Sequence, residues 1–216
     1  MNPFIISGYH SAKYFCDREK ETKKLLNSIK NNRNVTIFSL RKIGKTGLIR
    51  HVFSKLNESK EISTFYIDIM PTRNLQEFIY VLGNEIIGKP DNKPLQIIKK
   101  AGQVFSKLRP QISYDVITGQ PQVSFIIQNE ADSKAILTEM FKYLDEQSRK
   151  KKIVVAIDEF QQIINYPENN VEELLRSMIQ RLKNVVFIFS GSQKHLLLNM
   201  FGDVKRPFYN STELLQ

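Results

Sequence analysis

Cysteine and long apolar runs are the two features that this sequence has least of. Cys16 is the only cysteine among 216 residues, which excludes a disulfide within the chain and a cysteine-rich zinc site. The longest uncharged apolar runs, Ile153–Ile157 and Val185–Phe189, have the length of strands, whereas a membrane helix needs about 20 such residues. The first ten residues lack the basic and apolar regions of a signal peptide. We therefore expect a globular, cytoplasmic protein with no membrane contact.

Acidic residues are fewer than basic ones. Lys and Arg total 32 against 22 Asp and Glu, so the formal net charge is +10. A positive field attracts nucleotides, nucleic acids and acidic surfaces. The charge is therefore compatible with either a protein or DNA as a partner. The basic residues are spread along the chain, and charge alone does not identify a DNA-binding protein. The densest run, Arg149–Lys152, follows a predicted helix, whose dipole favours cations there, and we prefer that interpretation to a DNA-contacting patch.

Short apolar strands alternate with amphipathic helices along most of the chain. The expected strands cover residues 35–38, 62–69, 153–157 and 185–189, and the main helices between and after them cover 47–56, 74–87, 133–148 and 171–182. Continuous apolar strands joined by helices indicate βαβ crossovers, and hence a mainly parallel sheet covered on both faces. The sequence therefore predicts an α/β fold with three layers, α/β/α, whose ligand binds at the carboxyl ends of the strands.

A segment of about residues 94–130 interrupts this alternation as a small insertion in a single domain spanning 1–216. A helix is expected over residues 95–108. Two runs of alternating apolar residues flank Thr118–Pro121 and predict a β-hairpin over residues 111–128. The hairpin can contact a partner, or it can cover an edge of the sheet.

The segment that joins the first predicted strand to its helix contains Gly44, Lys45 and Thr46. Phosphate-binding loops follow GxxxxGK[ST] in this context, and here Ser39 replaces the first glycine. Amides at a helix N-terminus bind anions, the lysine reaches the β- and γ-phosphates, and the hydroxyl ligates Mg²⁺. The flanking strand and helix make a chance tripeptide in a surface loop the weaker alternative. The predicted phosphate-binding residues are Ser39, Arg41, Lys42, Ile43, Gly44, Lys45, Thr46 and Gly47.

Two adjacent carboxylates, Asp158 and Glu159, follow the apolar strand 153–157. Burying an unpaired charge is costly, and a metal ion would explain the first of them. We expect Asp158 to hold Mg²⁺ together with Thr46. Glu159 would deprotonate the attacking water, and Lys45 would neutralise developing charge, so these two are the predicted catalytic residues. Surface or helix-capping acids are the alternative interpretation.

Polar residues also follow the strand 185–189. Ser190, Ser192 and Gln193 would lie between the loop and the two acids, where a polar side chain can contact the γ-phosphate or the water. A serine that caps the next helix explains the pattern equally well.

The three segments Ser39–Thr46, Ile153–Glu159 and Val185–Ser192 together resemble the AAA-like P-loop ATPases of the archaeal-type ATPase domain family, in the STAND group. Phe15–Glu19 resembles the family's aromatic-x-x-Arg-Glu signature, and Asn2–Tyr9 is similar to its bacterial branch. The resemblance implies a P-loop NTPase fold with ATP and Mg²⁺ as ligands. It also implies a Walker A motif ending at Thr46, a Walker B motif ending at Glu159, and a sensor role for Ser190 or Ser192.

The resemblance weakens toward the C-terminus. Pro207–Tyr209 is similar to a family motif that continues with glycine and arginine, but Asn210 and Ser211 stand in those places. Arg206 is the only nearby substitute for an arginine finger, and a surface arginine is the simpler interpretation. The family's core continues with a fifth strand, a helical lid and commonly a winged-helix region. We expect none of these before Gln216, and therefore expect the chain to be a fragment of a longer protein.

Two functions follow from these features. The first is hydrolysis of ATP to ADP and phosphate, which would drive a conformational switch, with or without oligomerisation. The alternative is a nucleotide-gated regulatory or DNA-associated module with little turnover. A P-loop phosphotransferase is disfavoured because the sequence shows no arginine-rich lid.

Overall fold

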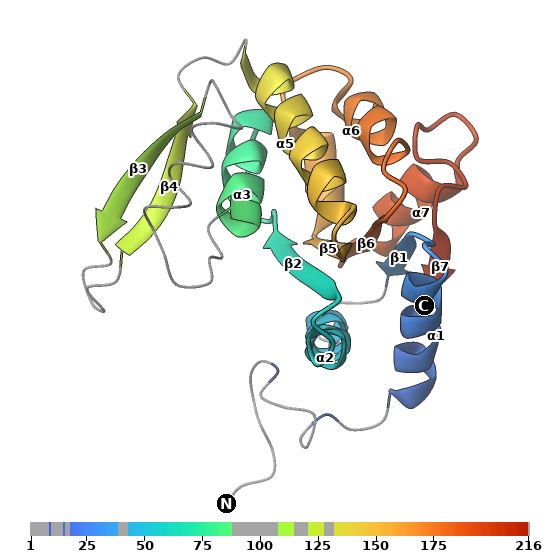
Figure 1. Cartoon of the computed structure of the whole chain (residues 1–216). Coiled ribbons are helices and arrows are strands. Elements are labelled where there is room, and N and C mark those ends of the chain that lie inside the picture. The colour runs from blue at the N-terminus through green and yellow to red at the C-terminus, as the bar shows by residue number, and fades with distance from the viewer. Residues whose placement is uncertain are drawn as a thin grey trace, which may run out of the picture.

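A five-stranded parallel sheet organises the protein (Figure 1). The computed structural model describes residues 9, 15, 18–38, 43–87, 108–114, 121–127 and 132–215. The strand order is β2-β5-β6-β1-β7, and every neighbouring pair in it is parallel. The strands are β1 (Val35–Phe38), β2 (Ile62–Asp68), β5 (Lys152–Asp158), β6 (Val185–Gly191) and β7 (Glu213–Leu215).

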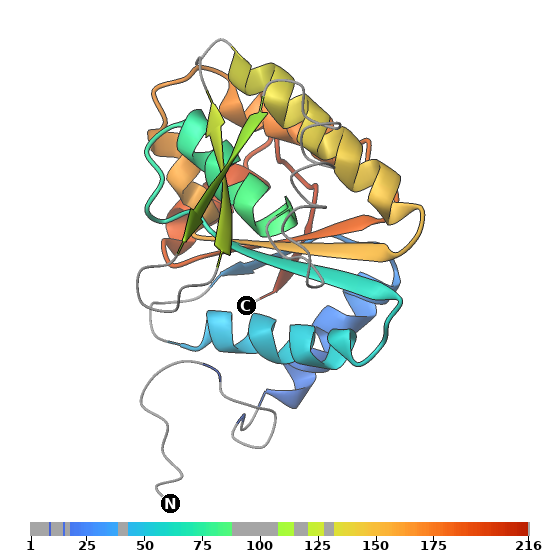
Figure 2. The same ribbon diagram turned by 60° about the vertical axis from the view of Figure 1, so that its left-hand side comes forward.

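Helices cover both faces of this sheet, which confirms the predicted three-layer α/β/α fold. Figure 2 shows the two blue helices on one face and the green and yellow helices on the other. The first face carries α1 (Glu19–Lys30) and α2 (Lys45–Asn57). The second carries α3 (Leu75–Ile87), α5 (Ser133–Ser148), the 3₁₀ helix η3 (Phe160–Asn165), α6 (Val171–Ile179) and α7 (Lys194–Gly202).

The central strands are apolar throughout because each of them contributes to two cores. Along β5, Ile153, Val155 and Ile157 pack under α3 and α5, whereas Val154 and Ala156 pack under α1 and α2. Successive side chains of a strand point to opposite faces, so a strand covered on both sides needs an unbroken apolar run. This packing ends at Asp158, where the first charged side chain lies at the sheet's carboxyl edge.

An aromatic cluster fixes the C-terminal segment to the second face. Phe160, Phe189, Phe201 and Phe208 have ring centroids 4.5–6.0 Å apart. Phe208 is fully buried, although it follows Pro207 in an irregular segment. Such rings are among the largest contributions of burial to stability, at about 1.5–3 kcal/mol each. The Pro207–Tyr209 motif therefore has a packing role.

The expectation that no fifth core strand precedes Gln216 is wrong. Glu213–Leu215 forms β7, which pairs in parallel with β1, and the Glu213 amide donates to the Asn34 carbonyl at 2.8 Å. The Glu213 carboxylate accepts a hydrogen bond from Ser28 Oγ of α1 at 2.8 Å. Three residues are too few to show a strand period, and this strand is held by contacts with residues far away in sequence. The lid, the winged-helix region and the fragment hypothesis stay predictions.

The predicted hairpin strands form a separate two-stranded sheet. β3 (Leu108–Tyr114) and β4 (Pro121–Ile127) are antiparallel, with Ile112 opposite Val123. Both views place this ribbon beside α3 (Figures 1 and 2). The helix predicted over residues 95–108 lies outside the described residues, except that Leu108 begins β3. The bounds of the insertion stay a prediction.

Within the described ranges, the structure contains no helix long and apolar enough to cross a membrane.

Candidate functional site

The candidate site lies where β1, β5 and β6 end and α2 begins. Gly44 precedes α2 with a φ of +77°, and its carbonyl accepts the Leu48 amide at 2.9 Å. Only glycine adopts this left-handed conformation without steric cost, so Gly44 permits the turn into the helix. The turn leaves the first amides of α2 without intrahelical partners, at the positive end of the helix dipole.

The carboxylate of Asp158 lies at the centre of the site and is only 5% exposed. Its Oδ2 atom accepts hydrogen bonds from Thr46 Oγ1 at 2.9 Å and from the Tyr66 hydroxyl at 2.5 Å. Its Oδ1 atom accepts hydrogen bonds from Ser190 Oγ at 2.6 Å and from the Glu159 amide at 3.0 Å. Four donors therefore satisfy a buried negative charge that would otherwise be costly.

Parallel register explains why these donors meet. Ile157 of β5 lies opposite Phe189 of β6, so Ser190 is the next residue along the neighbouring strand. On the other side Asp68 of β2 lies opposite Asp158. Tyr66 comes two residues before Asp68 and so lies on the same face of β2. The carboxyl ends of three adjacent strands thus surround one carboxylate.

Glu159 is oriented differently from its neighbour. Its φ is +55°, a left-handed conformation that non-glycine residues rarely adopt and that is often found at functional sites. Its Oε2 atom accepts hydrogen bonds from the Ser192 amide at 3.2 Å, from Ser192 Oγ at 2.8 Å and from Gln161 Nε2 at 2.5 Å. The backbone turn therefore aims the two adjacent carboxylates at different partners.

Gly191 allows Gln161 to reach Glu159. A Cβ atom at position 191 would lie 2.0 Å from Gln161 Oε1, which is far below any real contact distance. Gln161 is 3% exposed, and its Oε1 atom has no hydrogen-bond partner within the described part of the chain. The glycine between Ser190 and Ser192 is therefore needed for close approach.

Three acids at this edge repel one another. Burial is the main cause that raises the pKa of Asp68, and the charges of Asp158 and Glu159 raise it further, against a hydrogen bond from the Met70 amide. Burial and the hydrogen bond to Asp158 also raise the pKa of the Tyr66 phenol, so this hydroxyl stays protonated and donates. The Arg50 guanidinium lies 4.5 Å from the centroid of the Tyr66 ring and supplies a positive charge nearby.

The N-terminal signature packs against the loop and α2. Arg18 Nη1 donates to the Ile43 carbonyl at 3.0 Å, directly before Gly44. Phe15 stacks on His51 of α2, with ring centroids 4.1 Å apart. A Cβ atom on Gly47 would lie 3.8 Å from the Phe15 ring. Beside them is a pocket of about 450 Å³, lined in part by Phe15, Arg18 and His51.

The predicted site residues are only partly brought together. Lys45, at 7% exposure, begins α2 next to Thr46, and Ile43 is 48% exposed. Ser39, Arg41 and Lys42 lie outside the described residues. Ser190 contacts Asp158, whereas Ser192 contacts Glu159. Gln193 occupies the N-cap position of α7, where its side chain makes no capping hydrogen bond.

Arg206 lies elsewhere, paired with another helix. Its Nη2 atom contacts Glu172 Oε1 of α6, and the two side chains are 30% and 12% exposed. Burial is the main cause that raises the pKa of Glu172, and the Arg206 charge opposes it. This half-buried pair holds the C-terminal segment to α6, so Arg206 is not the free surface arginine that the sequence suggests.

Tyr66, Asp68 and Gln161 are the site residues that the sequence analysis missed. Tyr66 and Asp68 are two residues apart near the carboxyl end of a predicted strand, so their side chains lie on the same face of it. This spacing would have pointed to the site if β2 had been known to lie beside β5. Gln161 carries no such signal, because its role depends on the turn at Glu159.

The donor set fits Mg²⁺. The hydroxyl of Thr46 and the carboxylate of Asp158 offer oxygen atoms, which this ion prefers, and Asp68 places a second carboxylate nearby. No group of three or more His, Cys, Asp or Glu side chains suited to a metal occurs among the described residues. A magnesium ion bound with phosphates needs only one or two protein ligands, so this small set is sufficient.

Comparisons with known proteins agree with this geometry. The sequence profile of an ATPase domain found predominantly in Archaea matches residues 15–205. No curated protein sequence matches the chain. Among solved structures, a Walker-type ATPase of Pyrococcus abyssi is similar over 99% of this chain and 56% of its own, with 22% identity and a TM-score of 0.65.

Two origin-recognition proteins of Aeropyrum pernix also share the fold. The ORC1 protein, solved in complex with DNA, has 14% identity and a TM-score of 0.58, over 94% of this chain and 46% of its own. The ORC2 protein has 15% identity and a TM-score of 0.56, over 93% and 47%. The chain spans about half the length of these structures, and at such identities the likeness shows the fold alone.

Gly191→Ala is expected to destabilise the protein by about 1–3 kcal/mol, because the added methyl group would displace Gln161 from Glu159. The measurement is chemical denaturation followed by circular dichroism. Gly202→Ala is the matched control, since a Cβ atom there meets nothing within 4 Å. Equal stability of the two variants would contradict the close packing at Gly191.

Asp68→Asn is expected to raise the Tm of the nucleotide-free protein at pH 7 only slightly, by no more than about 1 °C, because Asp68 is exposed and solvent screens its charge. The folded-state pKa of Asp68 is raised, so its ionised form destabilises the fold above that pKa. The difference in Tm between the variant and wild type should shrink as the pH falls below the raised pKa of Asp68 toward about 3.9, the ordinary pKa of an aspartate. The exposed Glu58→Gln is the control, and a pH-independent difference would contradict a charge effect.

Proposed function

This chain belongs to the family of ATPase domains found predominantly in Archaea, and from that premise we propose that it binds ATP with Mg²⁺ and hydrolyses ATP to ADP and phosphate. The observation that carries the proposal is the 2.9 Å hydrogen bond between Thr46 Oγ1 and Asp158 Oδ2. It joins the first turn of α2 to the acid at the end of β5. These two elements are 112 residues apart in sequence, and both are needed to hold a triphosphate and its metal.

The first turn of α2 would bind the phosphates. The amides of the first turn, which point along the helix axis, and the dipole of a 13-residue helix favour an anion at this position. Lys45 would contact the β- and γ-phosphates, and the proposed contacts of Ser39, Arg41, Lys42, Ile43 and Gly47 complete the loop. The pocket beside Phe15, Arg18 and His51 adjoins the same helix and is a candidate place for the nucleoside.

Thr46 and Asp158 would hold the metal. A bound Mg²⁺ would neutralise charge on the phosphate oxygens. The part of this chain is to present the two oxygens in fixed positions, and three of the four donors to Asp158 come from β2, β6 and α2. Tyr66 in particular orients the carboxylate without itself being a metal ligand, so it is a positioning residue.

Glu159 would act as the general base. Its Oε2 atom is held by Ser192 and Gln161, which orients the carboxylate and leaves Oε1 to take a proton from water. Ser192 thereby links the orientation of the base to the loop after β6. Ser190 acts on the other acid, Asp158, and each serine thus suits a sensor role at a different carboxylate.

The same contacts favour a second function, a nucleotide-gated module with little turnover. Glu159 is restrained by three donors, and Arg206 is paired with Glu172 instead of facing the site. A conformational switch that depends on nucleotide binding alone does not require Glu159 or Arg206 to leave these partners. The net charge of +10 and the DNA complex of the ORC1 relative are compatible with DNA as the regulated partner.

Two variants separate these functions. Lys45→Ala should weaken Mg·ATP binding by about tenfold or more, because a charge that contacts the phosphates is lost. Glu159→Gln should leave binding within about threefold and lower kcat by about 100-fold or more, because the base is removed. Binding is measured with a fluorescent ATP analogue, and turnover by phosphate release.

Lys183→Ala and Glu146→Gln, both exposed, are the controls for charge. If Glu159→Gln hydrolyses ATP as fast as wild type does, hydrolysis at this site is rejected. The nucleotide-gated module with little turnover is then the remaining function. Unchanged binding in Lys45→Ala would reject the phosphate site itself.

Tyr66→Phe tests the positioning of Asp158. The variant removes one hydrogen bond to Oδ2 and keeps the ring against Arg50, so the Mg²⁺ concentration at half-maximal activity should rise about three- to tenfold. The KM for ATP at saturating Mg²⁺ should stay within about twofold. Tyr80→Phe on α3, exposed and distant from the acids, is the control. An unchanged Mg²⁺ dependence in Tyr66→Phe would mean that the residue only packs.

A further inference from the structure

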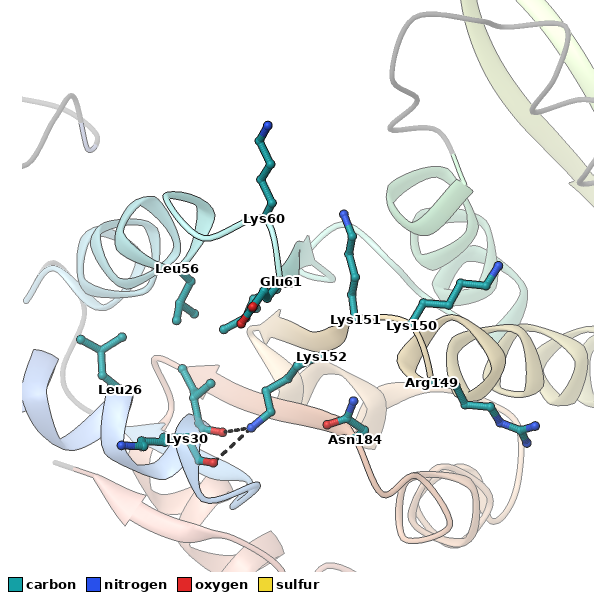
Figure 3. Close-up of a pocket in the computed structure, with 12 residues that line it drawn as sticks. Leu26, Lys30, Leu56, Lys60, Glu61, Arg149, Lys150, Lys151, Lys152 and Asn184 are labelled. Carbon is teal, nitrogen blue, oxygen red and sulfur yellow. Dashed lines mark hydrogen bonds between the residues drawn. The ribbon is translucent and has the colours of Figure 1, made fainter.

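A second pocket lies at the opposite edge of the sheet, where the strands begin (Figure 3). Its volume is about 630 Å³. It is lined by residues at the start of β2 and β5, by Asn184 just before β6, and by the ends of α1 and α2. Lys152 of the lining and Asp158 are the first and last residues of the seven-residue β5, and this length corresponds to about 20 Å. A partner bound here would therefore stay away from the acids around Asp158, although Leu26 also lines the pocket beside Phe15 and His51.

The floor of this pocket is apolar. Ile29 and Leu56 are 1% and 8% exposed, and Leu26 and Ile62 are partly buried beside them. Lys152 forms part of the wall, where its Nζ atom donates to the carbonyls of Ile29 and Lys30 at 3.0 and 3.1 Å. This lysine therefore caps the end of α1 and is not available to a ligand.

The rim of the pocket is basic. Figure 3 shows Lys60 and Lys151 extending in the same direction from the turns before β2 and β5, whereas Lys150 extends away from these two. All three are exposed, and no carboxylate of the described ranges forms an ion pair with them. Of the lining residues that the structure describes, Glu61 is the only acid.

The helix dipoles account for only part of this charge. Three helices end around the pocket, and cations are favourable within the last turn of each. Lys152 already caps α1, and Arg149 directly follows α5 and pairs with Asp145 at 3.1 Å. Lys60 lies three residues beyond the end of α2, and Lys150 and Lys151 lie beyond the end of α5. The rim thus carries more positive charge than the C-termini of these helices stabilise.

We propose that this pocket binds an acidic peptide segment of a partner protein. An aliphatic side chain of the segment would sit on the floor at Leu26 and Ile62, and its carboxylates would face Lys60, Lys150 and Lys151. Apolar burial supplies attraction, and charge complementarity supplies orientation and a fast encounter. The two layers of the pocket, apolar below and basic above, match a peptide that alternates aliphatic and acidic residues.

Other anions fit less well. Among the described residues no aromatic side chain lines the pocket, so they offer single-stranded nucleic acid no stacking platform. The phosphate backbone of a duplex would not fill a concave apolar floor. A small free anion would meet the carbonyl ends of helices, which carry partial negative charge, instead of helix amides. Carboxylates are therefore expected only at the rim.

The test measures fluorescence anisotropy of a labelled peptide with the repeat Glu-Glu-Leu, using the full 216-residue chain at physiological salt. Lys150→Glu with Lys151→Glu should weaken binding about tenfold, because two attractions become repulsions. Lys134→Glu with Lys142→Glu, two exposed positions on α5, makes the same change in net charge and should alter binding less than twofold. Binding of the fluorescent ATP analogue should be unchanged in both double variants.

A floor variant tests the apolar part. Leu26→Gln should weaken binding of the Glu-Glu-Leu peptide and leave the weaker binding of polyglutamate unchanged, with the Tm confirming that the protein folds. Equal losses in the two double variants would overturn the proposal in favour of unspecific charge attraction. Tighter binding of duplex DNA, lost in Lys150→Glu with Lys151→Glu, would assign the surface to nucleic acid instead. No peptide binding by wild type would also overturn the proposal.

Discussion

The buried carboxylate of Asp158 is the constraint on which the candidate site depends. A charge that is 5% exposed needs compensating donors, and this one receives hydrogen bonds from α2, β2, β6 and its own backbone turn. Each donor comes from a different segment, so the carboxylate ties the phosphate-loop helix to the carboxyl ends of two neighbouring strands. A residue with this many partners cannot move alone, and any ligand that changes its hydrogen bonds affects several elements at once.

Glu159 shows the opposite arrangement. It follows Asp158 directly, but its positive φ directs it to the loop after β6, where Ser192 and Gln161 hold it. Two adjacent acids therefore belong to separate hydrogen-bond networks, and each network includes one serine of the segment 190–192. The glycine between those serines is what lets the second network form. The separation gives the chain one carboxylate suited to a metal and another whose partners can be exchanged.

Much of the fold follows from local sequence patterns, because strands buried on both faces must be apolar throughout. The runs in β5 and β6, the glycine before α2 and the acids after β5 are all visible without coordinates. Register within a parallel sheet then brings Ser190 to Asp158. The fifth strand, β7, was missed because three residues carry no period, and its anchor, Glu213, contacts Ser28 of α1. Tyr66 and Gln161 were missed for a related reason, since their partners depend on which strands are neighbours and on one unusual backbone turn.

The parallel sheet also gives the two ends of the molecule opposite electrostatic character. Helix N-termini and strand carboxyl ends meet at the candidate nucleotide site, so anions are favoured there and the acids need a cation. Helix C-termini gather at the other end, so cations are favoured, and Lys152 meets this need by capping α1. Lys60, Lys150 and Lys151 exceed what the helices require, and they surround an apolar floor that a fully solvated surface does not need. Leu26 and Ile62 are only partly buried in this floor, so an aliphatic side chain of a partner would cover them while its carboxylates pair with the lysines around them.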